Sequence, residues 1–285
     1  MIDVQSFDVA DAGVDWLSAS SPERNLYDYA NSLHWRTEYR RHWAMLGYAG
    51  FETEGVRAGI NADGASFVQL SGQYARTNWR SYYQEAANCS RLDIQVTVKT
   101  KQYRGDIAER FGTRLHSYQT EVRAKRGPLK MPKPRLINGY GEGDTLYIGS
   151  RSSAQMCRIY DKEKESRKPE YLCCWRFEIE FHDELAKMMA ATLIGSEHTE
   201  HLAVRLAVMA WLKNRGLYVT FHSGREGINL PNTYHKTELE EKLMWLEKQV
   251  RPTLQKLLVA GYGLSAINAL DLETYLPELQ EYVSI

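Results

Sequence analysis

Strict alternation of apolar and polar residues in two stretches constrains the fold of this chain more than any other feature. In residues 91–99 and 174–181 every second side chain is apolar, and Asp93, Glu178 and Glu180 lie among the polar residues between them. A period of two is typical of β-strands that pack one face on an apolar core. The sequence therefore predicts two strands whose charged residues lie on the face away from the core.

The rest of the chain adds further strands and several helices. Short apolar runs bounded by turn residues predict strands at 66–70, 145–149 and 155–162. Apolar residues at three- and four-residue spacing predict helices at 23–46, 75–87, 184–194, 200–216, 236–260 and 264–270. Residues 103–111 also fit a helix, residues 116–124 fit a strand or a helix, and the Pro- and Gly-rich stretch 127–143 predicts a loop.

These elements predict an α+β fold. An antiparallel sheet would carry helices on one face and leave its charged face open, and a helical C-terminal part would follow. Gly, Ser, Asn and Pro cluster near 196–199 and 223–232. We expect a sheet domain over residues 1–195 and a helical region over 196–285 that serves in binding or in packing.

Charge is unevenly distributed, although the chain holds 36 basic and 36 acidic residues. Residues 99–135 contain eleven basic and three acidic residues, a net charge of +8, so the remainder is at −8. Such segregation favours a surface that faces a polyanion such as nucleic acid, although a solvated charged face has the same pattern. Five candidate contacts lie at the proline-punctuated end of this stretch: Lys125, Arg126, Lys130, Lys133 and Arg135.

Other features exclude several classes of protein. No apolar run approaches the ~20 residues of a membrane-spanning helix, and residues 1–15 lack the basic and apolar regions of a secretory signal. The four cysteines include no Cys-x-x-Cys pair and are expected to be free, buried thiols. We therefore expect a cytoplasmic protein in a reducing compartment.

The charged residues of the predicted polar face support two interpretations. Arg158 and Lys162 could pair with Glu178 and Glu180 across strands, on a face that simply meets water. Alternatively, two or three carboxylates that converge on one point suit Mg²⁺ or Mn²⁺. A tyrosine hydroxyl beside that metal could attack phosphorus, while arginine and lysine hold the phosphate oxygens and lower the phenol pKa from its usual ~10.

Several short motifs lie on or beside these strands. They are Arg-Leu-Asp at 91–93, Leu-Tyr-Ile-Gly-Ser-Arg-Ser-Ser at 146–153, Arg-Ile-Tyr-Asp-Lys at 158–162 and Trp-Arg-Phe-Glu-Ile-Glu at 175–180. With Leu-Ser-Gly-Gln at 70–73 and the stretch 245–254, this combination resembles the replication initiation factor family of rolling-circle plasmids and phages, which includes related bacterial relaxases of conjugative elements. The resemblance extends from about residue 66 to residue 261.

The resemblance implies a site-specific, metal-dependent nickase whose catalytic face is the open face of the sheet. A tyrosine would cut one strand of origin DNA, remain linked to the 5′-phosphate, free a 3′-hydroxyl for synthesis and rejoin strands at termination. Tyr160 is the expected nucleophile and Tyr147 its rival. Residues expected to hold the phosphate are Arg151, Arg158 and Lys162. Residues expected to bind Mg²⁺ or Mn²⁺ are Asp93, Glu178 and Glu180.

Partners and alternative activities follow from the same resemblance. The expected partner is origin DNA, double-stranded or in a hairpin and single-stranded at the nick, with a host helicase and polymerase as further partners and no membrane. The protein would act as a monomer or homodimer. Three alternatives remain: a binding protein for an origin or operator that does not cut, a metal-dependent hydrolase that uses water, and a conjugative relaxase with the same tyrosine chemistry.

Overall fold

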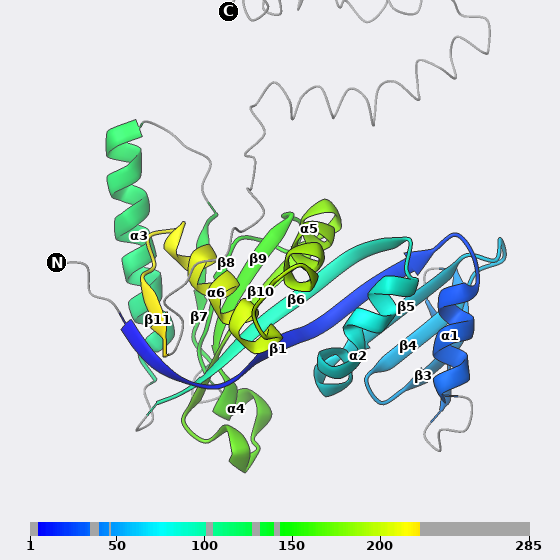
Figure 1. The fold of residues 1–285 in the computed structure, drawn as a ribbon. Coiled ribbons are helices and arrows are strands. Elements are labelled where there is room, and N and C mark those ends of the chain that lie inside the picture. The colour runs from blue at the N-terminus through cyan, green and yellow to red at the C-terminus, as the bar shows by residue number, and fades with distance from the viewer. Residues whose placement is uncertain are drawn as a thin grey trace, which may run out of the picture. The chain divides into compact units, whose positions relative to one another are not determined.

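One twisted sheet organises the part of the chain that the structure describes. The computed structural model describes residues 5–34, 40–45, 47–100, 105–126, 132–139 and 143–222. Its strands are β1 (Gln5–Ser21), β2 (Arg41–Met45), β3 (Tyr48–Thr53), β4 (Val56–Ile60), β5 (Ser66–Ser71), β6 (Asn88–Lys99), β7 (Pro134–Ile137), β8 (Thr145–Ile148), β9 (Gln155–Asp161), β10 (Cys174–His182) and β11 (Val219–Phe221). Within the described residues these eleven strands form one sheet (Figure 1).

β1 joins the two halves of the sheet, because it lies between β5 and β6. The order is β2-β3-β4-β5-β1-β6-β10-β9-β8-β7, and β11 pairs with the start of β1. Only the β1–β11 pair is parallel among the described strands. The helices are α1 (Asn25–His34), α2 (Gly72–Glu85), α3 (Ile107–Arg126), α4 (Lys162–Ser166), α5 (Asp183–Ile194) and α6 (Glu200–Lys213), with a 3-10 helix η1 (Pro169–Tyr171). The predicted α+β fold is confirmed.

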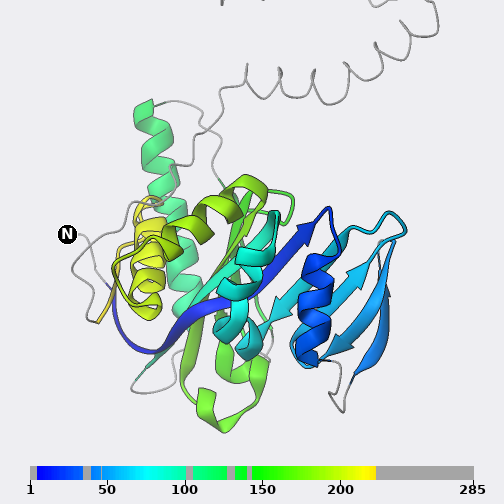
Figure 2. The same cartoon turned by 45° about the vertical axis from the view of Figure 1, so that its right-hand side comes forward.

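The N-terminal half of the sheet contains strands that the sequence did not predict. A single helix was expected over 23–46, but α1 ends at His34 and residues 41–45 form β2. Met45 pairs with Tyr48, so β2 and β3 are joined by a tight hairpin turn in which Gly47 has φ of 81°. A turn of this kind needs positive φ, which glycine adopts without steric cost. The helix prediction is therefore wrong beyond α1, which packs on β4 and β5 (Figure 2).

β1 is a 17-residue strand that pairs with both halves of the sheet. Residues 16–21 pair with β5, and residues 8–20 pair with β6. The register along β6 shifts between Val9 and Asp11, between Val14 and Trp16, and between Ser18 and Ala19. The first two shifts each add a residue to β1 and break its period of two, which explains why the sequence pattern does not reveal this strand. The third shift adds a residue to β6.

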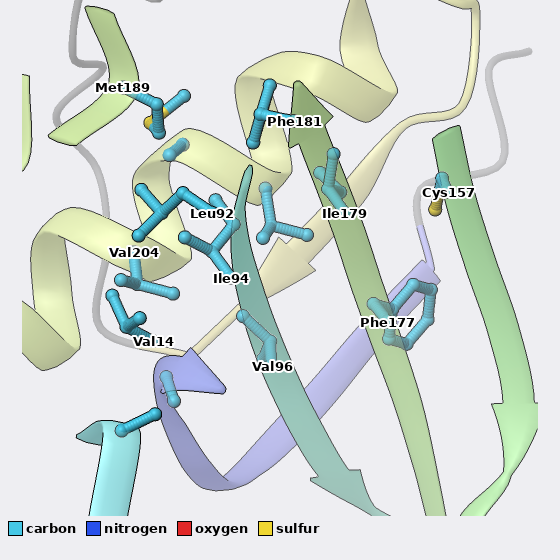
Figure 3. Close-up of a cluster of buried hydrophobic side chains, with 14 of the residues drawn as sticks. Val14, Leu92, Ile94, Val96, Cys157, Phe177, Ile179, Phe181, Met189 and Val204 are labelled. Atoms are coloured by element: carbon cyan, nitrogen blue, oxygen red, sulfur yellow. The ribbon is translucent and has the colours of Figure 1, made fainter. Parts of the chain in front are cut away.

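The apolar core lies between the central strands and three helices. α5 and α6 pack on β6 and β10, and α3 packs on β7 and β8. Figure 3 shows Leu92 and Ile94 of β6 beside Val204 of α6. Phe177 of β10 is fully buried, and its ring centroid lies 5.7, 5.5 and 5.5 Å from those of Phe7, Phe111 and Phe221. The alternation over 91–99 and 174–181 therefore predicted both the strands and the face that meets the core.

The region 103–143 differs from its prediction in two places. Residues 107–126 form the single helix α3, although the sequence favoured two shorter elements. Residues 134–137 form β7 within the expected loop. β7 is the last strand of the sheet path and begins with Pro134. An edge position tolerates proline because that residue has no N–H to donate to a neighbouring strand.

The C-terminal part of the sheet domain extends beyond the expected boundary at residue 195. α6 packs on β1 and β6, and β11 pairs with β1. The chain divides into two compact units, residues 1–232 and 233–285. The predicted helices at 236–260 and 264–270 lie outside the described residues. Across the described part of the chain, the helices are all too short or too polar to cross a membrane.

Candidate active site

Strand register brings the polar residues of the central motifs together on one face of the sheet. Glu178 is the β10 partner of Arg158, and Glu180 is the partner of Asp93 in β6. Tyr160 lies two residues from Arg158, so it shares the same face of β9. The polar face does not simply meet water, because Asp93, Glu178, Glu180 and Tyr160 are at most 8% exposed.

Tyr160 belongs to a buried cluster with Glu178 and Arg158. The Tyr160 hydroxyl donates a hydrogen bond to Glu178 Oε2 at 3.0 Å. Arg158 Nη2 donates to the other carboxylate oxygen, Oε1. The cross-strand pairing of Arg158 with Glu178 that the sequence allowed is thus present, but it also includes the tyrosine. One carboxylate is held by a guanidinium on one side and faces a phenol on the other.

Burial and charge keep the phenol protonated. Burial raises the pKa of Tyr160 above its usual range, and the negative charge of Glu178 raises it further. Arg176 and Arg158 act in the opposite direction but are outweighed. The expectation that flanking cations lower the pKa of this phenol is therefore wrong. A proton acceptor is needed if the hydroxyl is to act as a nucleophile.

A second cluster lies where the start of β6 pairs with the end of β10. Arg91 Nε and Nη2 donate to the two oxygens of Asp93 at 2.9 and 2.6 Å. The same Nη2 lies 2.8 Å from Glu180 Oε2, and His182 Nε2 lies 2.8 Å from Glu180 Oε1. Burial raises the pKa of Asp93 to about 7, with repulsion from Glu178 and Glu180 added, although Arg91 opposes this shift.

Asp93, Glu178 and Glu180 are the carboxylates expected to hold a divalent cation. No three His, Cys, Asp or Glu side chains of the described residues are grouped as they would be around a metal ion. Asp93 and Glu180 nevertheless converge on one point, which Arg91 Nη2 holds. His182 Nε2 is close to the other oxygen of the Glu180 carboxylate, at 2.8 Å. Carboxylate oxygens are the donors that Mg²⁺ and Mn²⁺ prefer, but in this structure both carboxylates are paired with Arg91.

The other expected phosphate-holding residues lie near Tyr160 or on the surface. Lys162 Nζ lies 5.8 Å from the centre of the Tyr160 ring and pairs with Glu165 at 2.6 Å rather than with Glu180. Arg151 is exposed in the turn between β8 and β9. The structure thus brings Lys162 to the Tyr160 cluster, whereas Arg151 lies at the end of the strands.

The rival tyrosine occupies a neighbouring position. Tyr147 of β8 is the cross-strand partner of Arg158, and it is half-buried. The guanidinium of Arg135 lies 5.1 Å from the centre of the Tyr147 ring. Both tyrosines therefore lie beside Arg158, but the hydrogen bond to Glu178 belongs to Tyr160.

Sequence analysis missed polar residues that β1 and β10 add to this face. Asp15 of β1 lies 3.4 Å from Arg176 and 3.4 Å from Arg76 of α2. Burial raises the pKa of Asp15, which Arg176 partly offsets. His182 and Arg91 were also missed as members of the carboxylate cluster. Their positions two residues from Glu180 and Asp93 on alternating strands were the available signal for them.

The basic residues proposed to contact DNA lie at one edge of the molecule. Lys125 is exposed on the last turn of α3, and Lys133 and Arg135 are exposed before and within β7. These positions leave the cations accessible to a polyanion. The Arg126 side chain and Lys130 lie outside the described residues.

Comparison with known proteins agrees with this arrangement. The chain is similar to a rolling circle replication initiator protein from Geobacillus stearothermophilus, with 18% identity, a TM-score of 0.50, and coverage of 81% of this chain and 91% of that structure. At this identity the similarity shows the fold. No curated protein matches the chain. The family model described as "Replication initiation factor" matches residues 91–279, which include the residues of both clusters, and the chain therefore belongs to the replication initiation factor family.

Proposed function

We propose that this protein starts rolling-circle replication by cutting one strand of origin DNA with Tyr160. The observation that carries the proposal is the buried hydrogen bond from the Tyr160 hydroxyl to Glu178, which Arg158 holds from its other side. Family membership supports a role in the initiation of replication. The same cluster supports the proposal with a hydroxyl, a carboxylate and a guanidinium, which would serve as nucleophile, proton acceptor and phosphate-binding cation.

The proposed step replaces one phosphate ester bond with another and consumes no ATP. The Tyr160 oxygen attacks phosphorus, its proton passes to Glu178 Oε2, and the bond from phosphorus to the 3′-oxygen breaks. The leaving 3′-oxygen receives the proton from Glu178 through a water molecule, so a 3′-hydroxyl and a 5′-phosphotyrosine result and the carboxylate is restored. Attack by a 3′-hydroxyl in the reverse direction rejoins the strand. Glu178 thus receives a proton-accepting role in place of the metal-binding role expected from the sequence.

Asp93 and Glu180 are the carboxylates proposed to hold Mg²⁺ or Mn²⁺. A bound divalent cation would polarise the scissile phosphate and offset its charge. Both residues lie on the same face as Glu178, and the charges of Glu178 and Glu180 raise the pKa of Asp93. A cation bound by Asp93 and Glu180 would offset the repulsion between these carboxylates.

A labelled oligonucleotide tests the proposal directly. The protein is incubated with single-stranded origin DNA and Mn²⁺ and then run on a denaturing protein gel. We expect a labelled band at the mass of protein plus DNA, sensitive to nuclease and resistant to boiling in detergent. Binding without such a band would contradict the proposal and favour an origin-binding protein, whereas DNA cleavage without the band would favour a hydrolase that uses water.

Lys133 is proposed to bind the DNA backbone, together with Lys125 and Arg135. We expect Lys133→Ala to weaken binding to all DNA sequences about equally, because a phosphate contact carries no base information. The slope of log K against log salt should fall by about 1, measured by fluorescence anisotropy. Lys187→Ala is the matched control, since Lys187 lies on α5 and pairs with Glu184. An equal loss in both variants would remove Lys133 from the interface.

A further inference from the structure

The described helices that pack on the N-terminal half of the sheet lie on one of its two faces. α1 packs on β4 and β5, on the face that carries Phe51, since the ring centroids of Tyr27 and Phe51 are 5.9 Å apart (Figure 2). α2 packs beside α1, with the ring centroids of Tyr29 and Tyr82 5.0 Å apart. Successive residues of a strand point to opposite faces. Gly50, which precedes Phe51 in β3, therefore lies on the face away from α1.

Three aromatic side chains lie together on this second face. Strand pairing puts Trp43, Gly50, Gly59 and Phe67 in one row across β2, β3, β4 and β5. The rings of Trp43 and Phe67 are stacked, with centroids 6.2 Å apart and an angle of 18° between their planes. The ring centroid of Tyr48 lies 5.6 Å from that of Phe67. These three aromatic residues form what we call the aromatic plate.

The glycines of this row let the plate lie flat on the sheet. A Cβ atom at Gly59 would be 2.9 Å from Trp43 Cζ3 and 3.1 Å from Tyr48 Cβ. The indole therefore rests on the backbone of β4 and is only 9% exposed. Tyr48 and Phe67 are half-buried, so part of each ring meets solvent. Aromatic surface gathered on an open face is typical of a binding site.

A row of polar residues runs beside the aromatic plate and reaches the candidate active site. Its members are successive cross-strand partners through β2, β3, β4, β5, β1, β6 and β10. In that order they are Arg41, Glu52, Arg57, Gln69, Ser18, Arg91 and His182. With strands about 4.8 Å apart, this polar stripe is about 30 Å long. The face that carries the plate is therefore continuous with the face that carries Tyr160.

The outer part of the polar stripe presents positive charge. Arg57 Nε donates to Glu52 Oε1 at 2.8 Å, and Arg57 Nη1 donates to Gln69 Oε1 at 3.2 Å. These contacts fix the guanidinium, while the Arg57 side chain remains 41% exposed. Arg41 is exposed on β2, so two arginines face one carboxylate in this part of the stripe. Guanidinium groups bind phosphate through paired N–H groups.

We propose that the aromatic plate and the polar stripe bind an unpaired strand of origin DNA and lead it to Tyr160. Bases stack on the rings of Tyr48 and Phe67, and the arginines hold the phosphates. An open sheet face with exposed rings can accept bases only when they are unstacked, because a duplex hides the flat faces of its bases. The inference deepens the proposed function and rests on it for the identity of the strand.

Binding of oligothymidylate in EDTA tests the aromatic plate in the absence of cleavage. By fluorescence anisotropy we expect Tyr48→Leu to bind the single strand at least about fivefold more weakly than the wild type, through loss of stacking. Affinity for a duplex of the same length should be unchanged. Tyr27→Leu is the matched control and should bind as the wild type does. Both tyrosines are half-buried and contact one phenylalanine, but Tyr27 lies on α1.

Arg41→Ala tests the polar stripe. We expect weaker binding to the single strand and a slope of log K against log salt that falls by about 0.7, the contribution of one phosphate on single-stranded DNA. Arg24→Ala is the matched control, since Arg24 is an exposed arginine of the same half that pairs with Asp28 of α1. Arg41 is itself exposed, so this variant carries the test if circular dichroism melting shows that Tyr48→Leu is unfolded.

Unchanged affinity for the single strand in Arg41→Ala, or in a folded Tyr48→Leu, would overturn the proposal. An equal loss of affinity for the duplex would also overturn it, because the face would then bind paired DNA.

Photo-crosslinking locates the bound strand on the protein. On irradiation, 5-iododeoxyuridine in the oligonucleotide couples to an aromatic ring on which it stacks. We expect crosslinks in the tryptic peptides 42–57 and 58–76, which contain the aromatic plate. Crosslinks confined to other peptides would contradict the proposal.

The proposed function and the present inference can fail separately. None of these binding measurements requires cleavage. A protein that binds the single strand through the plate and the stripe but forms no covalent adduct would contradict only the proposed function. Adduct formation together with unchanged single-strand affinity in Arg41→Ala would contradict only the present inference.

Discussion

Tyr160→Phe is expected to abolish the covalent protein–DNA adduct while DNA affinity is retained. The change removes one oxygen atom, and with it the nucleophile and the hydrogen bond to Glu178. The ring, which is 8% exposed, remains in place, so the fold should not be disturbed. Adduct is measured on a denaturing gel with labelled origin DNA and Mn²⁺, and affinity by fluorescence anisotropy on the same oligonucleotide.

Tyr147→Phe is the matched control for this prediction. Tyr147 lies on the adjoining strand beside the same arginine, so the two variants differ mainly in the contact with Glu178. We expect Tyr147→Phe to form adduct at a rate close to that of the wild type. Adduct from Tyr160→Phe together with none from Tyr147→Phe would transfer the nucleophile to Tyr147.

Glu178→Gln is expected to slow adduct formation by about 10²–10⁴-fold, the usual range for loss of a general base. The amide keeps the shape of the side chain but cannot accept the phenol proton in the same way. Removing the carboxylate charge also removes one of the causes that raise the pKa of Tyr160. The phenol of the variant should therefore ionise at lower pH than in the wild type, and its residual rate should rise steeply with pH.

Mn²⁺ affinity distinguishes the two roles considered for Glu178, proton acceptor and metal ligand. As a proton acceptor, Glu178 can be changed to Gln with little loss of Mn²⁺ affinity. Asp93→Asn, by contrast, should lose Mn²⁺ binding because it removes one of the two carboxylates that converge on Arg91 Nη2. If Glu178→Gln lost Mn²⁺ binding to the same extent as Asp93→Asn, the metal-binding role expected from the sequence would be restored.

The sequence predicted the centre of the sheet well because one face of each central strand must meet the core. The alternation in 91–99 and 174–181 leaves only one choice of the face that meets the apolar core. β1 has the same requirement, but the two residues that β-bulges add to it hide the period. The wrong helix over 23–46 has a different cause: Trp43 fitted a helical spacing, although it also lies on one face of β2 with Arg41 and Met45.

The candidate site was predictable in composition but not in its contacts. Motifs supplied Tyr160, Asp93 and Glu178, whereas cross-strand register decides which carboxylate meets the phenol and which meets Arg91. The sequence predicted the wrong direction for the Tyr160 pKa shift, because a sequence shows neighbouring charges but not burial. For a phenol this deeply buried, loss of hydration outweighs the nearby arginines.

β1 limits how parts of such proteins can be exchanged between relatives. The family match begins at residue 91, yet the β6 strand that starts it is paired along most of its length with β1. A chimera joined at residue 91 would have to bring a foreign strand with the same bulges and an acid able to meet Arg176. A crossover in the turn at 61–65 between β4 and β5 meets the same requirement, because β1 precedes this turn and β6 follows it. The catalytic strands keep their own neighbour only when β1 is exchanged together with them.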